Sequence, residues 1–143
     1  AVPQVLSAAR VTGATVRGVL VQPMAPPGIE LIIGARRDPL VGPVVLVGLG
    51  GVLAELIDDV AVGLAPLGPN RATALLERLR AAAVLDGPRG RPAVSRQEIA
   101  RLLVAVGDLM VREPGIVELD LNPVVASPVR TVAVDALVVV NAS

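Results

Sequence analysis

The chain has 143 residues, a length that suits one domain of ordinary size with a substantial buried core. Its 13 basic residues, all of them arginine, balance 13 acidic residues, so net charge favours neither nucleic acid nor an anionic membrane as a partner. Histidine, cysteine, lysine and every aromatic residue are absent. This composition excludes a serine triad, thiolate chemistry, zinc or haem ligation, disulfides, a Schiff base and base stacking by this chain alone.

No segment is expected to cross a membrane. The longest uncharged run, Pro39 to Ala54, is shorter than the roughly 18 to 20 residues that a bilayer requires, and Pro and Gly interrupt it. The chain begins at Ala1 without an initiator Met, so we expect a mature or excised fragment in a cytoplasmic protein.

The first half of the chain is predicted to form short strands, because Val and Ile are enriched between Gly and Pro residues. The predicted segments are Val16–Gln22, Ile29–Arg36, Val44–Val47, Val52–Ile57 and Val60–Ala65. A rigid connector over Met24–Gly28 and a turn over Arg37–Pro39 separate the first three. The run Gly48–Gly51 either lets backbone amides approach a phosphate or makes a tight turn between strands.

Two helices are predicted next, because the apolar period changes to three and four residues. The first covers Pro69–Ala83. After the loop Asp86–Ala93, the sequence Ser95–Glu98 is a capping box that opens the second helix, which ends before Pro114. Strands followed by two helices and further strands favour an α+β fold, with a mostly antiparallel sheet packed against the two helices.

The stretch from Gly115 to Asp135 is predicted to be a β-hairpin with a turn over Ser127–Arg130. Side chains alternate along a strand, so Glu118, Asp120 and Asn122 share one face while the intervening apolar residues enter the core. A turn at this position places Asn122 opposite Asp135. The oxygens of two strands then meet, as a hard cation such as Mg²⁺ requires. The alternative is that these residues form the solvated polar face of an ordinary hairpin.

Several motifs, in order along the chain, carry a resemblance to a known family. They are GVLVQPMAPPGIELIIGARRDPLVGPVVLVGLGGVLAELIDDVAVGLAPL, GPRGRP, IVELDLNP and AVDA. From about Val16 to Ala136 the chain resembles the carboxy-terminal half of the ATP-grasp domain of ADP-forming acyl-CoA synthetases. These are acetate–CoA ligases related to the succinyl-CoA synthetase beta subunit. The resemblance implies that residues 1–143 are a single domain, the carboxy-terminal lobe of a larger ATP-grasp domain.

The resemblance implies an ATP/ADP site on the first strands. Gln22, Pro23 and Met24 would receive adenine, with Met24 packed on its face, and Glu30 would accept the ribose hydroxyls. Without the resemblance, these residues are a polar strand end, a gap-filling Met and an exposed strand acid.

The resemblance also implies a phosphate and metal site. Arg37, in the family's RDP motif, would offset charge near the terminal phosphate as a catalytic group, and Gly50 would contribute to phosphate binding. Val41 departs from the Phe that is usual in the family. Arg36 and Arg37 are alternatively an exposed pair that caps a strand end. Mg²⁺ ligation falls on three residues, Asp120, Asn122 and Asp135, with Glu118 outside the ligand set.

The implied reaction converts acyl-CoA, ADP and phosphate to carboxylic acid, CoA and ATP through a phosphohistidine on another segment. Partners would be ATP/ADP, the other ATP-grasp lobe and the CoA-binding domains of the parent protein, with neither nucleic acid nor membrane. Two other hypotheses remain. One is a non-catalytic regulatory module, as in fusions to Gcn5-related acetyltransferases. The other is homo-oligomerisation through Val-rich edge strands.

Overall fold

The computed structural model describes residues 2–13, 15–51, 59–90 and 92–141. Its helices are α1 (Val2–Val11), α3 (Pro69–Glu77) and α4 (Arg96–Arg112), with short 3-10 helices η1 (Ala82–Asp86) and η2 (Pro88–Gly90). Its strands are β1 (Ile29–Asp38), β2 (Gly42–Leu49), β3 (Val60–Leu64), β4 (Ile116–Ala126), β5 (Thr131–Ala133) and β6 (Ala136–Val140). Within the described residues, no helix is both long enough and apolar enough to span a bilayer.

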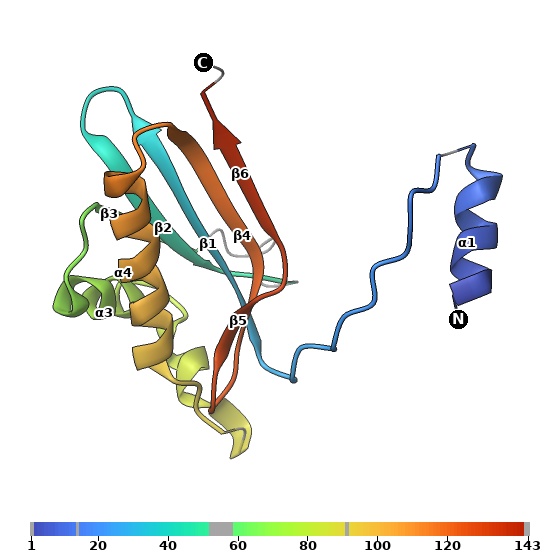
Figure 1. Cartoon of the computed structure of the whole chain (residues 1–143). Helices are drawn as coiled ribbons and strands as arrows, with labels where there is room; N and C mark the ends of the chain where they lie inside the picture. The colour runs from blue at the N-terminus through green and yellow to red at the C-terminus, as the bar shows by residue number, and fades with distance from the viewer. Residues whose placement is uncertain (1, 14, 52–58, 91, 142–143) are drawn as a thin grey trace.

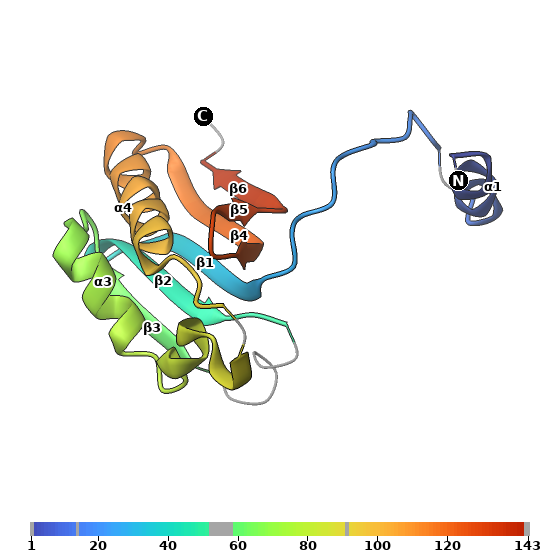
Figure 2. The same cartoon turned by 90° about the horizontal axis from the view of Figure 1, so that it is seen from below.

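The strands form one antiparallel sheet in the order β3-β2-β1-β4-β5, and β6 also pairs with β4 (Figure 1). Helices α3 and α4 lie on one side of this sheet (Figure 2). The predicted α+β class, with a sheet packed against two helices, is therefore confirmed. The sheet centres on β1, which pairs with β2 along one edge and with β4 along the other.

The two faces of the sheet differ in character because side chains alternate along each strand. On the helix side, Leu31, Ile33 and Ala35 of β1 are buried in a common core with Leu103 and Met110 of α4. The opposite face, here called the open face, carries Glu30, Ile32, Gly34 and Arg36 of β1. Three large side chains of β3 are between 46 and 48 % exposed on this face: Val60, Val62 and Leu64. The open face is therefore the face available to a ligand or partner.

The strand predicted over Val16–Gln22 is wrong. These residues belong to an extended segment without regular secondary structure, which joins α1 to β1 (Figure 1). Both edges of β1 are already paired, with β2 and with β4, so the segment cannot pair with β1. Helix α1, before this segment, was not predicted; none of its residues is buried.

The other predicted elements that fall within the described residues are present with altered ends. The helix predicted over Pro69–Ala83 ends at Glu77, where the chain turns and continues as η1. Only the first half of the capping box is confirmed: the N–H of Glu98 donates to Ser95 Oγ at 3.3 Å, whereas the N–H of Ser95 donates to the carbonyl oxygen of Ser127 at 3.2 Å. The predicted segment over Val52–Ile57 lies outside the described residues.

Candidate functional site

The predicted hairpin and its register are confirmed. Strand β4 leads into a turn in which the N–H of Ser127 donates to the carbonyl oxygen of Arg130 at 2.9 Å. Ser127 Oγ in turn accepts the N–H of Arg130 at 3.1 Å. The N–H of Asn122 donates to the carbonyl oxygen of Asp135 at 3.3 Å, so these two residues are opposite each other.

Two of the candidate metal ligands, Asp120 and Asn122, fall on the open face by strand alternation. Leu119 and Leu121 belong to the core on the helix side, so Asp120 and Asn122 belong to the other face. Asp120 pairs with Gly34 of β1 and with Leu137 of β6. Asp135 lies between β5 and β6, opposite Asn122 across the main-chain hydrogen bond.

The three residues offer only oxygen ligands, namely two carboxylates and one side-chain amide. The N–H of Ala136 donates to Asp135 Oδ1 at 2.9 Å and holds this carboxylate beside the start of β6. Within the described ranges, no group of three or more His, Cys, Asp or Glu residues is placed to hold a metal ion. A cation here would therefore draw part of its shell from the amide, from water and from a ligand. This is the usual arrangement for Mg²⁺ in phosphate sites.

Glu30 lies on the open face at the start of β1, beside the glycine turn that follows β2. The N–H of Gly50 donates to the carbonyl oxygen of Glu30 at 2.7 Å. The structure thus brings two predicted nucleotide-binding residues together. Glu30 pairs with Val125 of β4, further along the same face from Asn122.

Arg37, the predicted catalytic cation, lies on the helix side of the sheet. Its Nη2 donates to the carbonyl oxygens of Met110 at 2.6 Å and Glu113 at 3.3 Å, and its Nε donates to that of Ile116 at 3.3 Å. The guanidinium therefore joins β1 to the last turn of α4 at Met110, to Glu113 just after the helix and to Ile116 at the start of β4. The structure does not bring Arg37 together with Asp120.

Arg36 is the arginine of this pair that shares the open face. It pairs with Glu118 of β4 and Val44 of β2, and 66 % of its side chain is exposed. Its Nη2 is 4.0 Å from Asp38 Oδ2. The alternation from Glu30 through Ile32 and Gly34 to Arg36 is the sequence signal that separates it from Arg37.

The turn between β1 and β2 is fixed by Asp38. Its Oδ1 accepts the N–H groups of Leu40 at 2.9 Å and Val41 at 3.1 Å. These two hydrogen bonds, and to a smaller extent the nearby Arg36, hold the pKa of Asp38 below its ordinary value.

The predicted adenine residues lie outside the sheet. Gln22, Pro23 and Met24 are all exposed in the segment between α1 and β1, and Met24 is 91 % exposed. The structure does not bring them together with Glu30.

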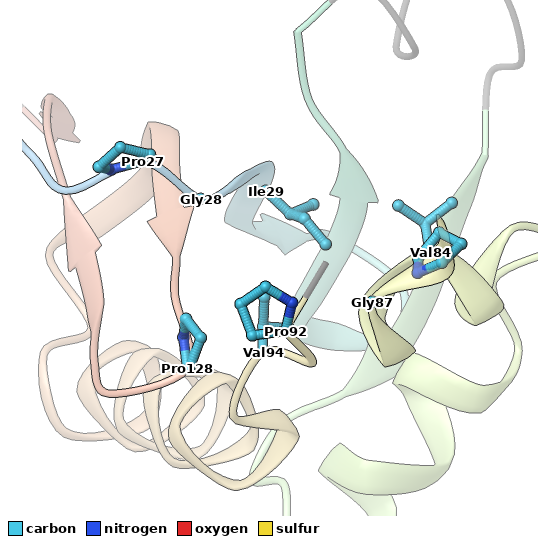
Figure 3. Close-up of a pocket in the computed structure, with 9 residues that line it drawn as sticks. Pro27, Gly28, Ile29, Val84, Gly87, Pro92, Val94 and Pro128 are labelled. Carbon is cyan, nitrogen blue, oxygen red and sulfur yellow. The ribbon is translucent and has the colours of Figure 1, made fainter. Parts of the chain in front are cut away.

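A pocket of about 410 Å³ lies elsewhere, between the start of β1, the loop around η2 and the turn after β4 (Figure 3). Every lining residue is proline, glycine or aliphatic, including Pro27, Pro92 and Pro128. Such a lining offers no charged group to a phosphate or a divalent cation, and none of the predicted site residues belongs to it.

Two residues with well-defined contacts were not among the predicted site residues. Gly51 lies against the carboxylate of Glu30 and has a left-handed backbone. The glycine-rich run Gly48–Gly51 predicts a turn, but it does not show which of its residues adopts this conformation. Asp59 is a carboxylate only 4 % exposed, and no sequence pattern distinguishes it from Asp58 beside it.

Comparison with known proteins supports a common ancestry for this geometry. Residues 3–140 match the ATP-grasp domain family. The chain is 39 % identical over 119 residues to the beta subunit of ADP-forming acetate–CoA ligase I of Pyrococcus furiosus. It covers 51 % of that subunit, and the match takes in 83 % of this chain.

Solved structures of an acetyl-coenzyme A synthetase from Candidatus Korarchaeum cryptofilum are also similar. One, in complex with coenzyme A, Ca-AMPCP and HgCl⁺, has a TM-score of 0.89 and 39 % identity, covering 98 % of this chain and 62 % of that one. Another, with coenzyme A and Mg-AMPPCP, has a TM-score of 0.78 and 43 % identity over 82 % of this chain and 55 % of that one. Its phosphohistidine segment points towards the nucleotide-binding site. The chain thus spans about half to two thirds of the length of these relatives.

Proposed function

Since this chain belongs to the ATP-grasp domain family, we propose that it is the carboxy-terminal lobe of a larger ATP-grasp domain that binds ADP or ATP with Mg²⁺ on its open face. The parent protein would be an ADP-forming acyl-CoA ligase. It would convert acyl-CoA, ADP and phosphate to carboxylic acid, CoA and ATP.

The pairing of Asn122 with Asp135, with Asn122 on the same face as Glu30, carries this proposal. Asn122 and Asp135 would supply cation ligands. Glu30, further along the sheet, would supply a carboxylate for the ribose hydroxyls. The similar protein crystallised with Mg-AMPPCP supports the assignment of a metal–nucleotide complex to this fold.

The oxygen ligands of Asp120, Asn122 and Asp135 suit Mg²⁺, which prefers carboxylate, carbonyl and water oxygens. These three residues would hold the cation against the nucleotide phosphates. When bound, Mg²⁺ neutralises charge on the transferred phosphoryl group. Gly50 would place its backbone near the phosphates, and Gln22, Pro23 and Met24 would close over adenine when the rest of the domain is present.

Arg37 in its predicted role would act as a fixed cation near the terminal phosphate. Direct contact would require its guanidinium to leave the three carbonyl groups at the junction of α4 and β4. Arg36 already lies on the open face and offers the same charge without this rearrangement.

The chain contains no histidine, so a phosphohistidine in this reaction must come from another segment of the parent protein. The CoA-binding domains and the other lobe of the ATP-grasp domain would likewise be supplied by the parent. The similar structure whose phosphohistidine segment points towards its nucleotide site is consistent with this division of roles.

Titration calorimetry of the full-length parent protein with ADP, in the presence and absence of Mg²⁺, tests the proposal. We expect binding that depends on Mg²⁺. ADP binding that is absent, or equally strong without the cation, would overturn the proposal.

A further inference from the structure

The glycine turn after β2 touches Glu30 in two separate ways. At Gly50, a Cβ would lie 3.0 Å from the carbonyl carbon of Glu30 and 3.2 Å from its oxygen. Glycine is therefore needed at this position for the turn to approach β1 closely enough for the 2.7 Å hydrogen bond between Gly50 and Glu30.

Gly51 touches the Glu30 side chain rather than its backbone. A Cβ at Gly51 would lie 2.9 Å from Glu30 Oε2, 3.6 Å from its Cδ and 3.9 Å from its Cβ. A Cβ at position 51 would therefore displace the carboxylate of Glu30 from its present position. Gly51 also has a φ of +63°, a conformation that glycine adopts without steric cost.

We propose that Gly51 is a positioning residue: because it has no side chain, it leaves free the place in which the carboxylate of Glu30 would receive the ribose hydroxyls of a bound nucleotide. The inference rests on the proposed function, because it takes the ribose contact of Glu30 from there. The glycine acts through Glu30 and not by contact with phosphate.

A ligand whose hydroxyl groups meet a fixed carboxylate is distinguished from the analogue that lacks them, because the analogue leaves the carboxylate unpaired. Gly51 should therefore affect the choice between ADP and 2′,3′-dideoxy-ADP. A residue that merely shapes the backbone would change the affinity for both nucleotides alike.

The test measures dissociation constants of Mg-ADP and Mg-2′,3′-dideoxy-ADP by calorimetry on the full-length parent protein. We expect unaltered protein to favour ADP by about 10-fold, the order expected of a hydrogen bond to a charged group. Gly51→Ala should weaken ADP binding and reduce this preference to below about threefold. In a Glu30→Ala background, Gly51→Ala should leave the preference unchanged, since the carboxylate through which it acts is gone.

Gly42→Ala is the matched control. Gly42 also has a positive φ, +84°, but a Cβ there meets no atom within 4 Å, so this variant introduces the backbone strain without the contact with Glu30. Its nucleotide preference should remain that of the unaltered protein. If Gly51→Ala fails to fold, Gly51→Asn takes its place, because asparagine tolerates positive φ and introduces the same Cβ.

Two results overturn the inference. One is an unchanged preference in Gly51→Ala or Gly51→Asn, while the unaltered protein binds ADP with Mg²⁺; this leaves the proposed function intact. The other is an unaltered protein that binds no ADP. That result removes the proposed function, and the positioning role with it.

Discussion

Asn122 of β4 is opposite Asp135, which lies between β5 and β6, and the N–H of Asn122 donates to the carbonyl oxygen of Asp135 at 3.3 Å. The same register continues on both sides of this pair, from Ala126 opposite Thr131 to Glu118 opposite Val139. Two residues with oxygen-bearing side chains, distant from the predicted adenine segment in sequence, are therefore held at one place by main-chain pairing.

We predict that Asn122→Ala and Asp135→Ala each weaken Mg²⁺-dependent ADP binding by the full-length parent protein by at least about 10-fold. Each substitution would remove one of the proposed cation ligands, and removing one partner of a charge-assisted contact costs about 1.5–3 kcal/mol. Calorimetry at constant Mg²⁺ measures the change. Asp120→Ala should act in the same direction.

Asp108→Ala is the matched control for these substitutions, because Asp108 is an exposed acid on α4, on the other side of the sheet. It should leave ADP binding within about twofold of the unaltered protein. If the three variants of the candidate ligands behave like this control, the metal site is not where we place it.

The register of the hairpin was predictable from sequence because two local signals agree. Pro128 within Ser127–Arg130 marks the turn, and apolar residues alternate along β4. Strand pairing then follows from counting outward from the turn, since a slip of one residue would turn Leu119 and Leu121 out of the core.

The segment before β1 was not predictable in the same way. Val16–Gln22 has the composition of a strand, but a strand requires a neighbour with free hydrogen-bonding groups, and both edges of β1 are occupied. The position of Arg37 was also missed. The RDP motif identifies the residue type, whereas only strand alternation shows that Arg37 belongs to the helix side and Arg36 to the open face.

We predict that Arg37→Ala lowers the free energy of unfolding by about 2 kcal/mol. The substitution leaves the carbonyl groups of Met110, Glu113 and Ile116 without the guanidinium that now binds them. It also frees the junction of α4 and β4 from β1. Urea unfolding, followed by circular dichroism, measures the loss.

Arg36→Ala is the comparison for Arg37. The Arg36 side chain is 66 % exposed and its ion pair with Asp38 is 4.0 Å long, so its removal should change stability by less than about 0.5 kcal/mol. Equal losses for the two variants would show that Arg37 does not stabilise the junction of α4 and β4.

We predict that the β1–β2 turn loses stability in acid. The folded-state pKa of Asp38 is lowered, so its ionised form contributes stability that is fully present above the unfolded-state value of about 3.9. This contribution is lost as pH falls from there through the folded-state pKa. Asp38→Asn keeps an acceptor oxygen but does not titrate in this range.

Urea midpoints of the unaltered protein and Asp38→Asn, compared between pH 7 and pH 2, test this dependence. The unaltered protein should be the more stable at pH 7, and the two midpoints should converge at the acid end. A constant difference across the range would mean that the titration of Asp38 does not contribute.

Asp59 is a buried carboxylate that joins β3 to the chain before η1. It is 4 % exposed, and its Oδ1 and Oδ2 accept the N–H groups of Arg80 and Ala81, each at 2.8 Å. Two hydrogen bonds from adjacent amides hold the end of the α3 region against the sheet. They also explain why the predicted helix stops short of Ala83.

Asp59→Ala should lower the free energy of unfolding by about 2–4 kcal/mol, because it leaves two part-buried N–H groups without the acceptor they now have. Asp86→Ala is the control: the Asp86 side chain is 64 % exposed in its ion pair with Arg96 and should contribute less than about 1 kcal/mol. Amide hydrogen exchange adds a local measure, since the amides of Arg80 and Ala81 should lose protection in Asp59→Ala and keep it in Asp86→Ala. Retained protection in Asp59→Ala would mean that these amides are held by something other than the carboxylate.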